Sequence, residues 1–253
     1  MKRIVSISLG SSQRDYTITT TLLGEQVHVR RIGTNGDIER VAALIREYDG
    51  AVDAIGLGGL TPIFRIGNAH YPHRQAQRIA ALAKKTPVAD GSLLKGTLER
   101  WAVKRAVDRE RSRFNYRRVF VFSGIDRYPL ASALSSYEVE LRFGDPRIHF
   151  NLPWGVQSLE GLERYARVAM PILALLPYSR IHPVALGNYG HDSRLEDYCK
   201  WADILAGDSA FLRRYAPKDL RGKTIFTDDP TPDEIEDLRE ARGRYADYND
   251  PRR

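Results

Sequence analysis

The sequence predicts an α/β protein with two lobes, the second of which contains a mostly parallel sheet. Strand-like segments alternate with amphipathic helical segments along the chain, an order typical of parallel sheets joined by helices. The length of 253 residues suits two domains of roughly 100–200 residues each. The run VFVF at 119–122 is wholly apolar, as is typical of a strand buried on both faces of a parallel sheet. We expect a smaller mixed α/β lobe with a connector helix over 1–112 and a second lobe over 113–253.

The first lobe combines alternating, β-branched segments, which predict strands, with segments of helical periodicity. Gly24-Glu25 is the expected pivot of a hairpin, and the segment TNGD at 34–37 is the expected cap of the first helix. The elements expected in this lobe are a strand at 3–9, a hairpin at 16–33, a helix at 38–48, a strand at 51–60, an irregular segment or small hairpin at 61–72, a helix at 73–85, a strand at 86–91 and the connector helix at 93–111.

The second lobe opens with a compact strand–helix–strand unit that ends at Gly144-Asp145. The next fifty or so residues contain an apolar helix and a loop rich in Gly, His and Asn. The elements expected in this lobe are a strand at 118–122, a helix at 128–135, a strand at 138–143, a helix at 161–177, strands at 202–208 and 222–230, a helix at 232–243 and a polar tail at 244–253.

Composition excludes several classes of protein. A hydrophobic fraction of 42% and a charged fraction of 28% predict a folded chain. Cys199 is the single cysteine, so no intramolecular disulfide and no Cys-based zinc site can form, which fits the cytoplasm. Cys199 lies in a helical pattern and is expected to be a small buried hydrophobe. The longest apolar run, 168–176, is about half of a bilayer span and carries a proline, so we expect no membrane segment.

The net charge of +7 makes nucleic-acid binding a hypothesis to weigh. The basic residues are scattered, and the one concentrated stretch, KRAVDRERSRFNYRR, also holds acidic residues. A solvated helix explains this stretch better than a nucleic-acid surface, so nucleic acid is not an expected partner. A basic nucleic-acid-binding protein is kept as the third hypothesis. A small-molecule substrate is the expected partner, and the oligomeric state is left open, a homo-oligomer included.

The strand, turn and helix at 118–135 predict an anion-binding turn, because free N–H groups and the positive end of the helix dipole converge there. A dinucleotide fold adds a carboxylate about 20 residues later to hold the adenosine ribose. Gly124 and Asp145 are 21 residues apart, which predicts NAD or NADP on a Rossmann-like lobe. The turn has one glycine where the dinucleotide fingerprint has three, and a plain strand–helix–strand unit whose aspartate caps a loop is the alternative. The expected cofactor ligands are Ser123, Gly124, Ile125, Asp126, Arg127 and Asp145.

Segments spread over residues 4–239 resemble the quinate 5-dehydrogenase family, which is related to shikimate-, quinate- and amino-acid-type dehydrogenases. They include VSISLGSS, VDAIGLGGL, TPVADGSLLKGTLER, SGIDRYPLASAL and WADILAGDSAFLRRYAPKDLRGKTI. The resemblance implies an NAD(P)-dependent oxidoreductase that transfers a hydride between the cofactor and a small hydroxylated, quinate-like substrate. Members of that family continue into another strand and helix where this chain ends in REARGRYADYNDPRR. A second lobe shortened at its C-terminus makes a catalytically inactive or regulatory nucleotide-binding relative the alternative.

The shikimate-type layout implied by this resemblance uses a lysine and an aspartate to handle the proton of the substrate hydroxyl. Lys95 and Asp90, in ADGSLLKG, are the matching pair. A lysine with a lowered pKa can accept the proton, and a carboxylate can orient it. The segment Asp90-Gly91-Ser92 is equally typical of a turn and helix cap beside a solvated lysine, and that alternative stays open.

Small residues at the ends of two strands are candidate substrate ligands. Ser8, Ser11 and Ser12 lie at the end of the first strand and could take a carboxylate or a phosphate. Gly58 belongs to a glycine loop that either approaches a ligand or lets two strands cross closely. His191, in GNYGHD, is either a site element or part of a surface turn. The histidines lack the spacing of a zinc site, so no metal is expected.

Overall fold

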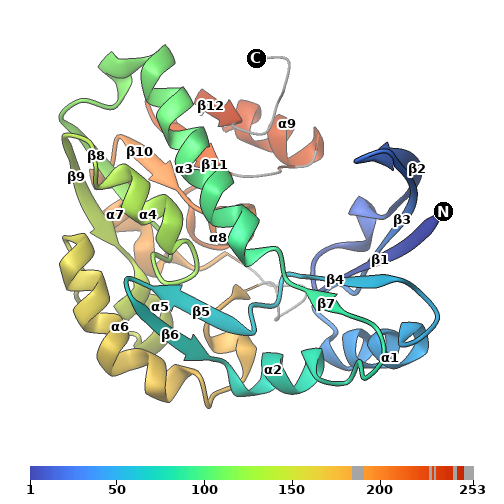
Figure 1. Cartoon of the computed structure of the whole chain (residues 1–253). Coiled ribbons are helices and arrows are strands. Elements are labelled where there is room, and N and C mark those ends of the chain that lie inside the picture. The colour runs from blue at the N-terminus through green and yellow to red at the C-terminus, as the bar shows by residue number, and fades with distance from the viewer. Residues whose placement is uncertain (184–190, 228–229, 231, 242–243, 248–253) are drawn as a thin grey trace. The chain divides into compact units, whose positions relative to one another are not determined.

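The computed structural model describes residues 1–183, 191–227, 230, 232–241 and 244–247 (Figure 1). The chain divides into two compact units. Unit 1 consists of Met1–Phe64, His70–Ser92 and Pro171–Tyr189, and unit 2 consists of Arg65–Ala69, Leu93–Met170 and Gly190–Arg253. This division differs from the expected boundary at 112/113 in two ways. The expected connector helix at 93–111 belongs to unit 2, and the later segment Pro171–Tyr189 belongs to unit 1.

Unit 1 is built on a five-stranded mixed sheet in the order β2-β3-β1-β4-β7. The central strand β1 (Lys2–Ser8) pairs in parallel with β3 (Glu25–Gly33) and β4 (Ala54–Gly58). The edge strand β2 (Tyr16–Leu22) is antiparallel to β3. The other elements are α1 (Ile38–Tyr48), β7 (Val88–Ala89), α2 (Arg74–Ala80), and 3-10 turns at Ser12–Arg14 and Tyr178–Arg180. The two-stranded sheet of β5 (Ile63–Ile66) and β6 (Ala69–Pro72) contains residues of both units, since Arg65–Ala69 belongs to unit 2.

Helix α1 forms where its cap and its periodicity predict it. The side chain of Asp37 accepts a hydrogen bond from the backbone N–H of Arg40, so the first turn is capped. Val41, Leu44 and Ile45 are spaced three and four residues apart and are all buried, which gives α1 one apolar face. That face contacts the central strand β1, so the helix covers the sheet.

Unit 2 is built on a five-stranded parallel sheet in the order β12-β11-β10-β8-β9. The chain starts at β8, moves outward to β9, returns past β8 to β10 and continues outward to β12. The elements are α3 (Ser92–Arg109), β8 (Arg117–Val121), α4 (Tyr128–Leu134), β9 (Val139–Phe143), α5 (Asp145–Phe150), α6 (Leu159–Leu173), α7 (Glu196–Trp201), β10 (Ile204–Ala206), α8 (Ser209–Tyr215), β11 (Thr224–Thr227), α9 (Pro232–Glu240), β12 (Arg244–Asp247) and 3-10 turns at Arg111–Arg113 and Ser193–Leu195.

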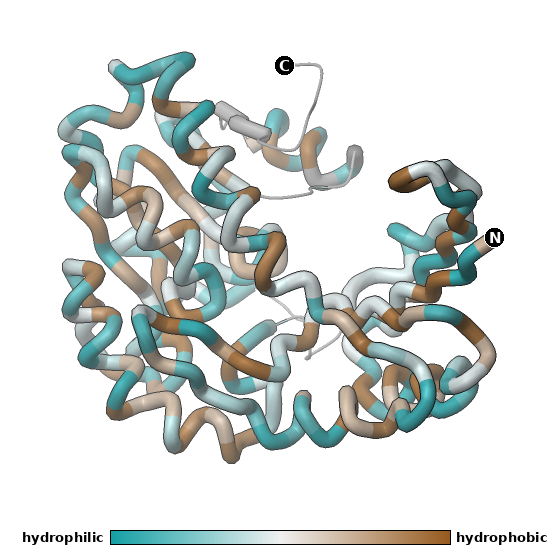
Figure 2. The backbone as a smooth tube through the Cα atoms, viewed as in Figure 1, coloured by the Kyte–Doolittle hydropathy of each residue, from teal (hydrophilic) through white to brown (hydrophobic). Residues whose placement is uncertain are grey.

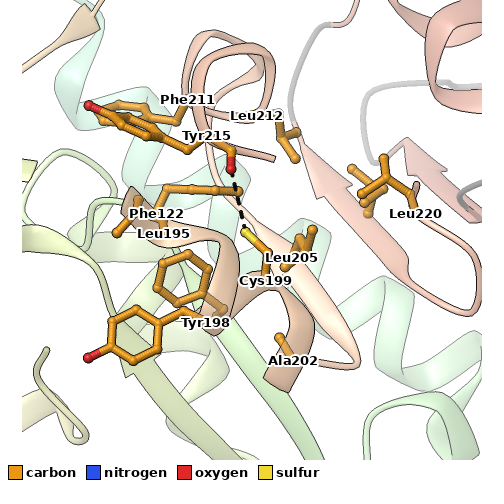
Figure 3. Packing of buried hydrophobic residues seen from close by; sticks show 12 residues of the cluster. Phe122, Leu195, Tyr198, Cys199, Ala202, Leu205, Phe211, Leu212, Tyr215 and Leu220 are labelled. Carbon is orange, nitrogen blue, oxygen red and sulfur yellow. Dashed lines mark hydrogen bonds between the residues drawn. The ribbon is translucent and has the colours of Figure 1, made fainter. Parts of the chain in front are cut away.

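The parallel sheet is covered on both faces, as the apolar run at 119–122 predicts. Successive residues of this run point to opposite faces, and Val119, Phe120, Val121 and Phe122 are all fully buried. Phe120 and Phe122 belong to a core formed with residues of α7 and α8 (Figure 3). Cys199 lies in this core, fully buried, which confirms its expected role as a small hydrophobe. Apolar stretches, brown in Figure 2, run through the strands of both units.

The structure corrects the expected elements at three places in unit 2. The tail expected to be only polar contributes β12, which pairs in parallel with β11 from Thr224–Arg244 to Thr227–Asp247. Helices α5 and α8 were not expected, because each is a short segment of six or seven residues with little periodicity to detect.

In the part of the chain that is described, none of the helices has the length and apolar character needed to cross a bilayer.

Candidate functional site

The carboxyl ends of the parallel strands position the candidate residues of unit 2. In open α/β sheets, ligands bind at this edge, next to the point where the strand order reverses. In unit 2 the reversal lies between β8 and β10. The turn after β8 contains Ser123 to Arg127, the turn after β9 begins at Gly144, and Asp208 follows β10. The predicted cofactor residues are thus brought together at one edge of the sheet.

The turn after β8 is closed by the side chain of Asp145. One carboxylate oxygen accepts hydrogen bonds from the N–H of Ile125 at 2.9 Å and the hydroxyl of Ser123 at 3.1 Å. The other accepts from the N–H of Gly124 at 2.8 Å. These are the donors that the sequence assigned to a pyrophosphate, and Asp145 itself is fully buried. The predicted ribose contact of Asp145 is therefore wrong for this structure, and the alternative, an aspartate that caps the loop, describes it.

The role expected for Gly124 is also corrected. A glycine was expected there so that a pyrophosphate could approach the backbone. A Cβ atom on Gly124 would instead lie 2.5 Å from Leu162 Cδ2 and 2.7 Å from Phe143 Cδ1. The missing side chain makes room for these two apolar residues, so Gly124 serves the packing of the turn.

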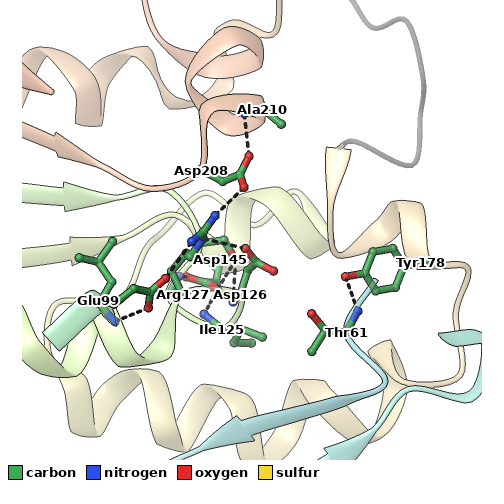
Figure 4. Close-up of polar contacts among 12 residues, drawn as sticks. Thr61, Glu99, Ile125, Asp126, Arg127, Asp145, Tyr178, Asp208 and Ala210 are labelled. Atoms are coloured by element: carbon green, nitrogen blue, oxygen red, sulfur yellow. Dashed lines mark hydrogen bonds and ion pairs between the residues drawn. The ribbon is translucent and has the colours of Figure 1, made fainter. Parts of the chain in front are cut away.

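Arg127 is the centre of a buried ionic network (Figure 4). Its guanidinium donates from Nη1 to Glu99 Oε1 at 2.8 Å and from Nη2 to Asp208 Oδ2 at 2.6 Å, and its Nε lies 3.5 Å from Asp126 Oδ2. Glu99 also accepts from the N–H of Leu130 at 3.0 Å. The side chains of Arg127 and Glu99 are 5% and 1% exposed. Arg127 thus joins α3, the β8 turn and the β10 turn, and its charge is committed to carboxylates instead of a phosphate.

His149 belongs to α5, the helix that begins at Asp145, and its side chain is buried. Its Nδ1 is 3.0 Å from the hydroxyl of Tyr165, and the two rings are stacked with an interplanar angle of 8°. Burial lowers the pKa of His149 to about 3, against the opposing attraction of Asp126. Burial raises the pKa of Asp145 to about 6, although the hydrogen bonds from Ile125, Gly124 and Ser123 favour its charged form.

We expect the stability of unit 2 to lose a contribution from His149 as the pH falls from 7 to 5. The unfolded imidazole binds a proton below its ordinary pKa of 6.5, whereas the folded one does so only near pH 3. Because protonation and unfolding are linked, His149 lowers the free energy of unfolding by about 2 kcal/mol at pH 5. Asp145 acts in the opposite direction, because its raised pKa makes the folded state the better proton binder between about pH 4 and 6.

Urea unfolding of the native protein and of His149→Phe at both pH values isolates this contribution. The difference in unfolding free energy between the two proteins should change by about 2 kcal/mol between pH 7 and pH 5. A difference that stays constant would contradict a buried neutral imidazole at this position.

A cavity of about 600 Å³ is lined by residues of α8 and α9, by Thr227 at the carboxyl end of β11, and by residues of the segment 216–220, which leads from α8 to β11. Leu212, Leu220 and Leu238 contribute to an apolar part of its wall. The polar lining residues include Ser209, after β10, and Thr227, at the end of β11. Thr227 is 1% exposed, and its hydroxyl has no hydrogen-bond partner among the described residues. A buried hydroxyl without a partner is costly, so this oxygen is the group in the cavity most in need of a ligand.

His191 also lines this cavity, and its role as a site element stays a prediction. Its Nε2 lies 3.4 Å from Glu196 Oε1. The basic side chains of Arg213 and Lys218 and the acidic side chains of Asp237 and Glu240 complete the polar lining.

The serines proposed as substrate ligands in unit 1 are each hydrogen-bonded to another residue of unit 1. Ser8 Oγ accepts from the N–H of Gly10 at 3.1 Å, and Ser11 Oγ accepts from the N–H of Gln13 at 3.1 Å. The hydroxyl of Ser12 accepts from the Asn35 side chain at 3.0 Å. Their roles as substrate ligands stay predictions, made on side chains that already have a structural use.

Gly58 lies at the end of β4 beside the last residue of β1. A Cβ on Gly58 would lie 3.0 Å from Ser8 Oγ, so the glycine lets the two strands lie close together. Gly58 is therefore a paired residue at the end of the β1–β4 ladder, and its role as a substrate ligand stays a prediction.

Asp90 and Lys95 lie on either side of the division between the units. Asp90 belongs to unit 1 and accepts from both the N–H and the hydroxyl of Ser92, at 3.1 and 2.9 Å, which is the turn and helix cap considered as the alternative. Lys95 belongs to α3 in unit 2 and is partly buried. Their pairing in proton transfer stays a prediction.

Sequence reasoning missed Glu99, Asp208 and Thr227. A signal for Glu99 was present: it is spaced four residues from Val103, and Val103 four from Val107, on the buried face of α3. A charge in such an apolar stripe requires a buried partner. For Thr227 the sequence holds no such signal, because the cavity beside it is formed by segments separated along the chain.

These features define an α/β protein of two units, one on a mixed and one on a parallel sheet. The chain belongs to the family described as "Domain of unknown function (DUF8754)", which matches residues 93–244. A second description, "Domain of unknown function (DUF8753)", matches residues 3–90. The two matches meet close to the division between the units at residues 92 and 93.

Comparison with known proteins adds little beyond the family. No curated protein sequence matches the chain. Two solved structures of aspartate transcarbamoylase from Trypanosoma cruzi are 10% identical to it. The complex with aspartate and phosphate has a TM-score of 0.37 and covers 94% of this chain and 79% of its own. The complex with phosphate has a TM-score of 0.34, with coverage of 94% and 78%. At these TM-scores the likeness supports no conclusion about fold or function.

Proposed function

We propose that unit 2 binds a nicotinamide dinucleotide, NAD or NADP, in the cavity lined by α8, α9 and Thr227. The protein would then be an oxidoreductase that transfers a hydride between this cofactor and a small hydroxylated, quinate-like substrate. The observation that carries the proposal is the cavity with the hydroxyl of Thr227, which has no partner among the residues that the structure describes. The resemblance of the sequence to the quinate 5-dehydrogenase family supports the choice of cofactor.

The size and place of the cavity support a cofactor site. Its volume of about 600 Å³ lies within the roughly 300–1,000 Å³ typical of small-molecule sites. Ser209 and Thr227 place one part of its wall at the carboxyl edge of the parallel sheet, the edge at which ligands of α/β proteins bind. The cavity also avoids the β8 turn, whose N–H groups are already bonded to Asp145.

The lining of the cavity suits a ligand with a ring and several polar groups. Apolar residues of α8 and α9, among them Leu212 and Leu238, can contact the flat face of a base or a nicotinamide. Arg213 and Lys218 can attract phosphate oxygens, and Thr227 can bond to a sugar hydroxyl or an amide. NAD(P), when bound, supplies the carbon that accepts the hydride.

Binding of NAD, NADH, NADP and NADPH to the full chain tests the cofactor. A ligand that binds only the folded state raises the melting temperature, and titration calorimetry then gives its Kd. Thr227→Val, which removes the hydroxyl and keeps the shape, is expected to raise the Kd about three- to tenfold, the usual worth of one hydrogen bond. Thr34→Val makes the same change at a buried threonine of unit 1 whose hydroxyl also has no partner in the described part of the chain, and it should leave the Kd unchanged.

The outcomes separate the alternatives. Failure of all four dinucleotides to bind would exclude the cofactor, and equal effects of the two valine substitutions would exclude this cavity as its site. Binding without reduction of NAD or NADP in the presence of quinate would favour a regulatory nucleotide-binding protein. Once cofactor binding is measured, substitution of Lys95 or Asp90 followed by an assay of turnover tests their predicted role in proton transfer.

A further inference from the structure

Strand β2 is the outermost strand of the unit 1 sheet, and in the described structure no strand lies beside its outer edge. All seven of its residues are exposed. Tyr16, Ile18 and Leu22 share one face of the strand and are 51%, 50% and 58% exposed. The tip of the β2–β3 hairpin, brown in Figure 2, carries Leu23, which is 97% exposed. The hairpin therefore presents apolar side chains and an open backbone edge together.

The edge of β2 lacks the features that prevent an exposed edge strand from pairing with another chain. Its sequence, YTITTTL, contains no charged residue and no proline. Its register with β3 runs without a bulge from Tyr16–Arg31 to Leu22–Glu25. Proteins usually protect an exposed edge with charge, proline, a bulge or a very short strand. Because β2 has none of these, its edge is suited to pair with another strand.

The hairpin geometry determines which backbone groups face outward. β2 and β3 are joined by Leu23 and Gly24, with φ of 51° and 83°, so Leu22 and Glu25 close a two-residue hairpin. Hydrogen-bonded and non-hydrogen-bonded pairs then alternate from this closing pair along the strand. The alternation directs the N–H and C=O groups at positions 17, 19 and 21, all threonines, away from β3.

A second copy of β2 fits this edge in an antiparallel register centred on Thr19. In this register Thr19 lies opposite Thr19 of the second copy, and Thr17 lies opposite Thr21. Every outward-facing residue therefore meets another outward-facing residue, and their N–H and C=O groups can bond in pairs. A two-fold axis through Thr19 relates the two strands, as in the commonest class of protein dimer.

The side chains of β2 match in the same register. Tyr16 lies opposite Leu22 of the second copy, which makes two apolar pairs across the interface, and Ile18 lies opposite Thr20 on the same face. The strand carries no charge, so two copies do not repel each other and a charged peptide finds no complementary group along it. Self-pairing therefore uses both the backbone and the apolar face of β2.

We propose that the protein forms a two-fold symmetric dimer in which the β2 strands of two copies pair antiparallel across Thr19. The two five-stranded sheets of unit 1 then form one continuous sheet. The interface is independent of the cofactor proposed for unit 2.

The oligomeric state of the full chain tests this dimer and its register. Sedimentation equilibrium over a range of concentrations is expected to show a dimer for the native protein. The double variant Thr17→Lys/Thr21→Lys places like charges opposite each other twice, and the dimer Kd should rise about tenfold or more. Thr17→Lys/Thr21→Glu changes the same exposed positions but places Lys opposite Glu, so it should remain a dimer with a Kd close to that of the native protein.

The two double variants keep the test independent of folding. Their circular dichroism spectra should agree with each other, and so should their melting temperatures at concentrations below both dimer Kd values, because all the changed side chains are exposed. A native protein that is monomeric at every concentration would overturn the proposal. Equal dimer Kd values for the two double variants would overturn the register.

Discussion

Arg127→Met is expected to lower the unfolding free energy of unit 2 by about 3–5 kcal/mol, the usual cost of removing one partner of a buried ion pair. The substitution keeps most of the apolar volume but leaves Glu99, whose side chain is 1% exposed, without its cation. Asp126 and Asp208 also face the guanidinium, and without its positive charge their mutual repulsion is no longer offset. Urea unfolding followed by circular dichroism measures the loss.

Two further variants show whether burial causes this loss. Adding Glu99→Gln to Arg127→Met should restore part of the stability, because the amide removes the charge and keeps an oxygen for the N–H of Leu130. Arg118→Met breaks an ion pair with Asp203 whose side chains are 46% and 27% exposed, and should cost no more than about 1 kcal/mol. Equal losses for Arg127→Met and Arg118→Met would contradict the special role of the buried network.

Asp145→Ala is expected to destabilise unit 2 by about 3–5 kcal/mol instead of changing a preference for NAD over NADP. The change leaves the buried N–H groups of Gly124 and Ile125 and the hydroxyl of Ser123 without their acceptor. Each unsatisfied buried donor costs about 1–3 kcal/mol, and removal of a desolvated carboxylate offsets part of the sum. Thermal and urea unfolding measure this loss.

Asp145→Asn and Asp108→Ala complete the experiment. Asparagine keeps one acceptor oxygen and should be intermediate in stability. Asp108 is an exposed residue of α3 that forms an ion pair with Lys104 of the same helix, so its loss should cost about 0.5 kcal/mol or less. If Asp145→Ala kept native stability and altered dinucleotide preference, the ribose contact predicted from the sequence would be restored.

Local patterns in the sequence determined the class of fold and most of its elements. Asp37 and the spacing of Val41, Leu44 and Ile45 predict α1, and the apolar run at 119–122 predicts a strand covered on both faces. The second small hairpin at 61–72 is present as β5 and β6. These features depend on near neighbours in the chain, where capping and periodicity act directly.

The tertiary structure decided which of these groups remain available for a ligand. The 21-residue spacing of Gly124 and Asp145 is compatible with a ribose contact and with a loop cap, and only the positions of Phe143 and Leu162 around the turn distinguish the two. The partners of Arg127 come from α3 and from the turn after β10, 28 and 81 residues away. The cavity at Thr227 is likewise formed by segments that meet only in the folded unit. Spacing along a chain constrains local geometry, whereas burial and the competition for hydrogen-bond donors depend on contacts between distant segments.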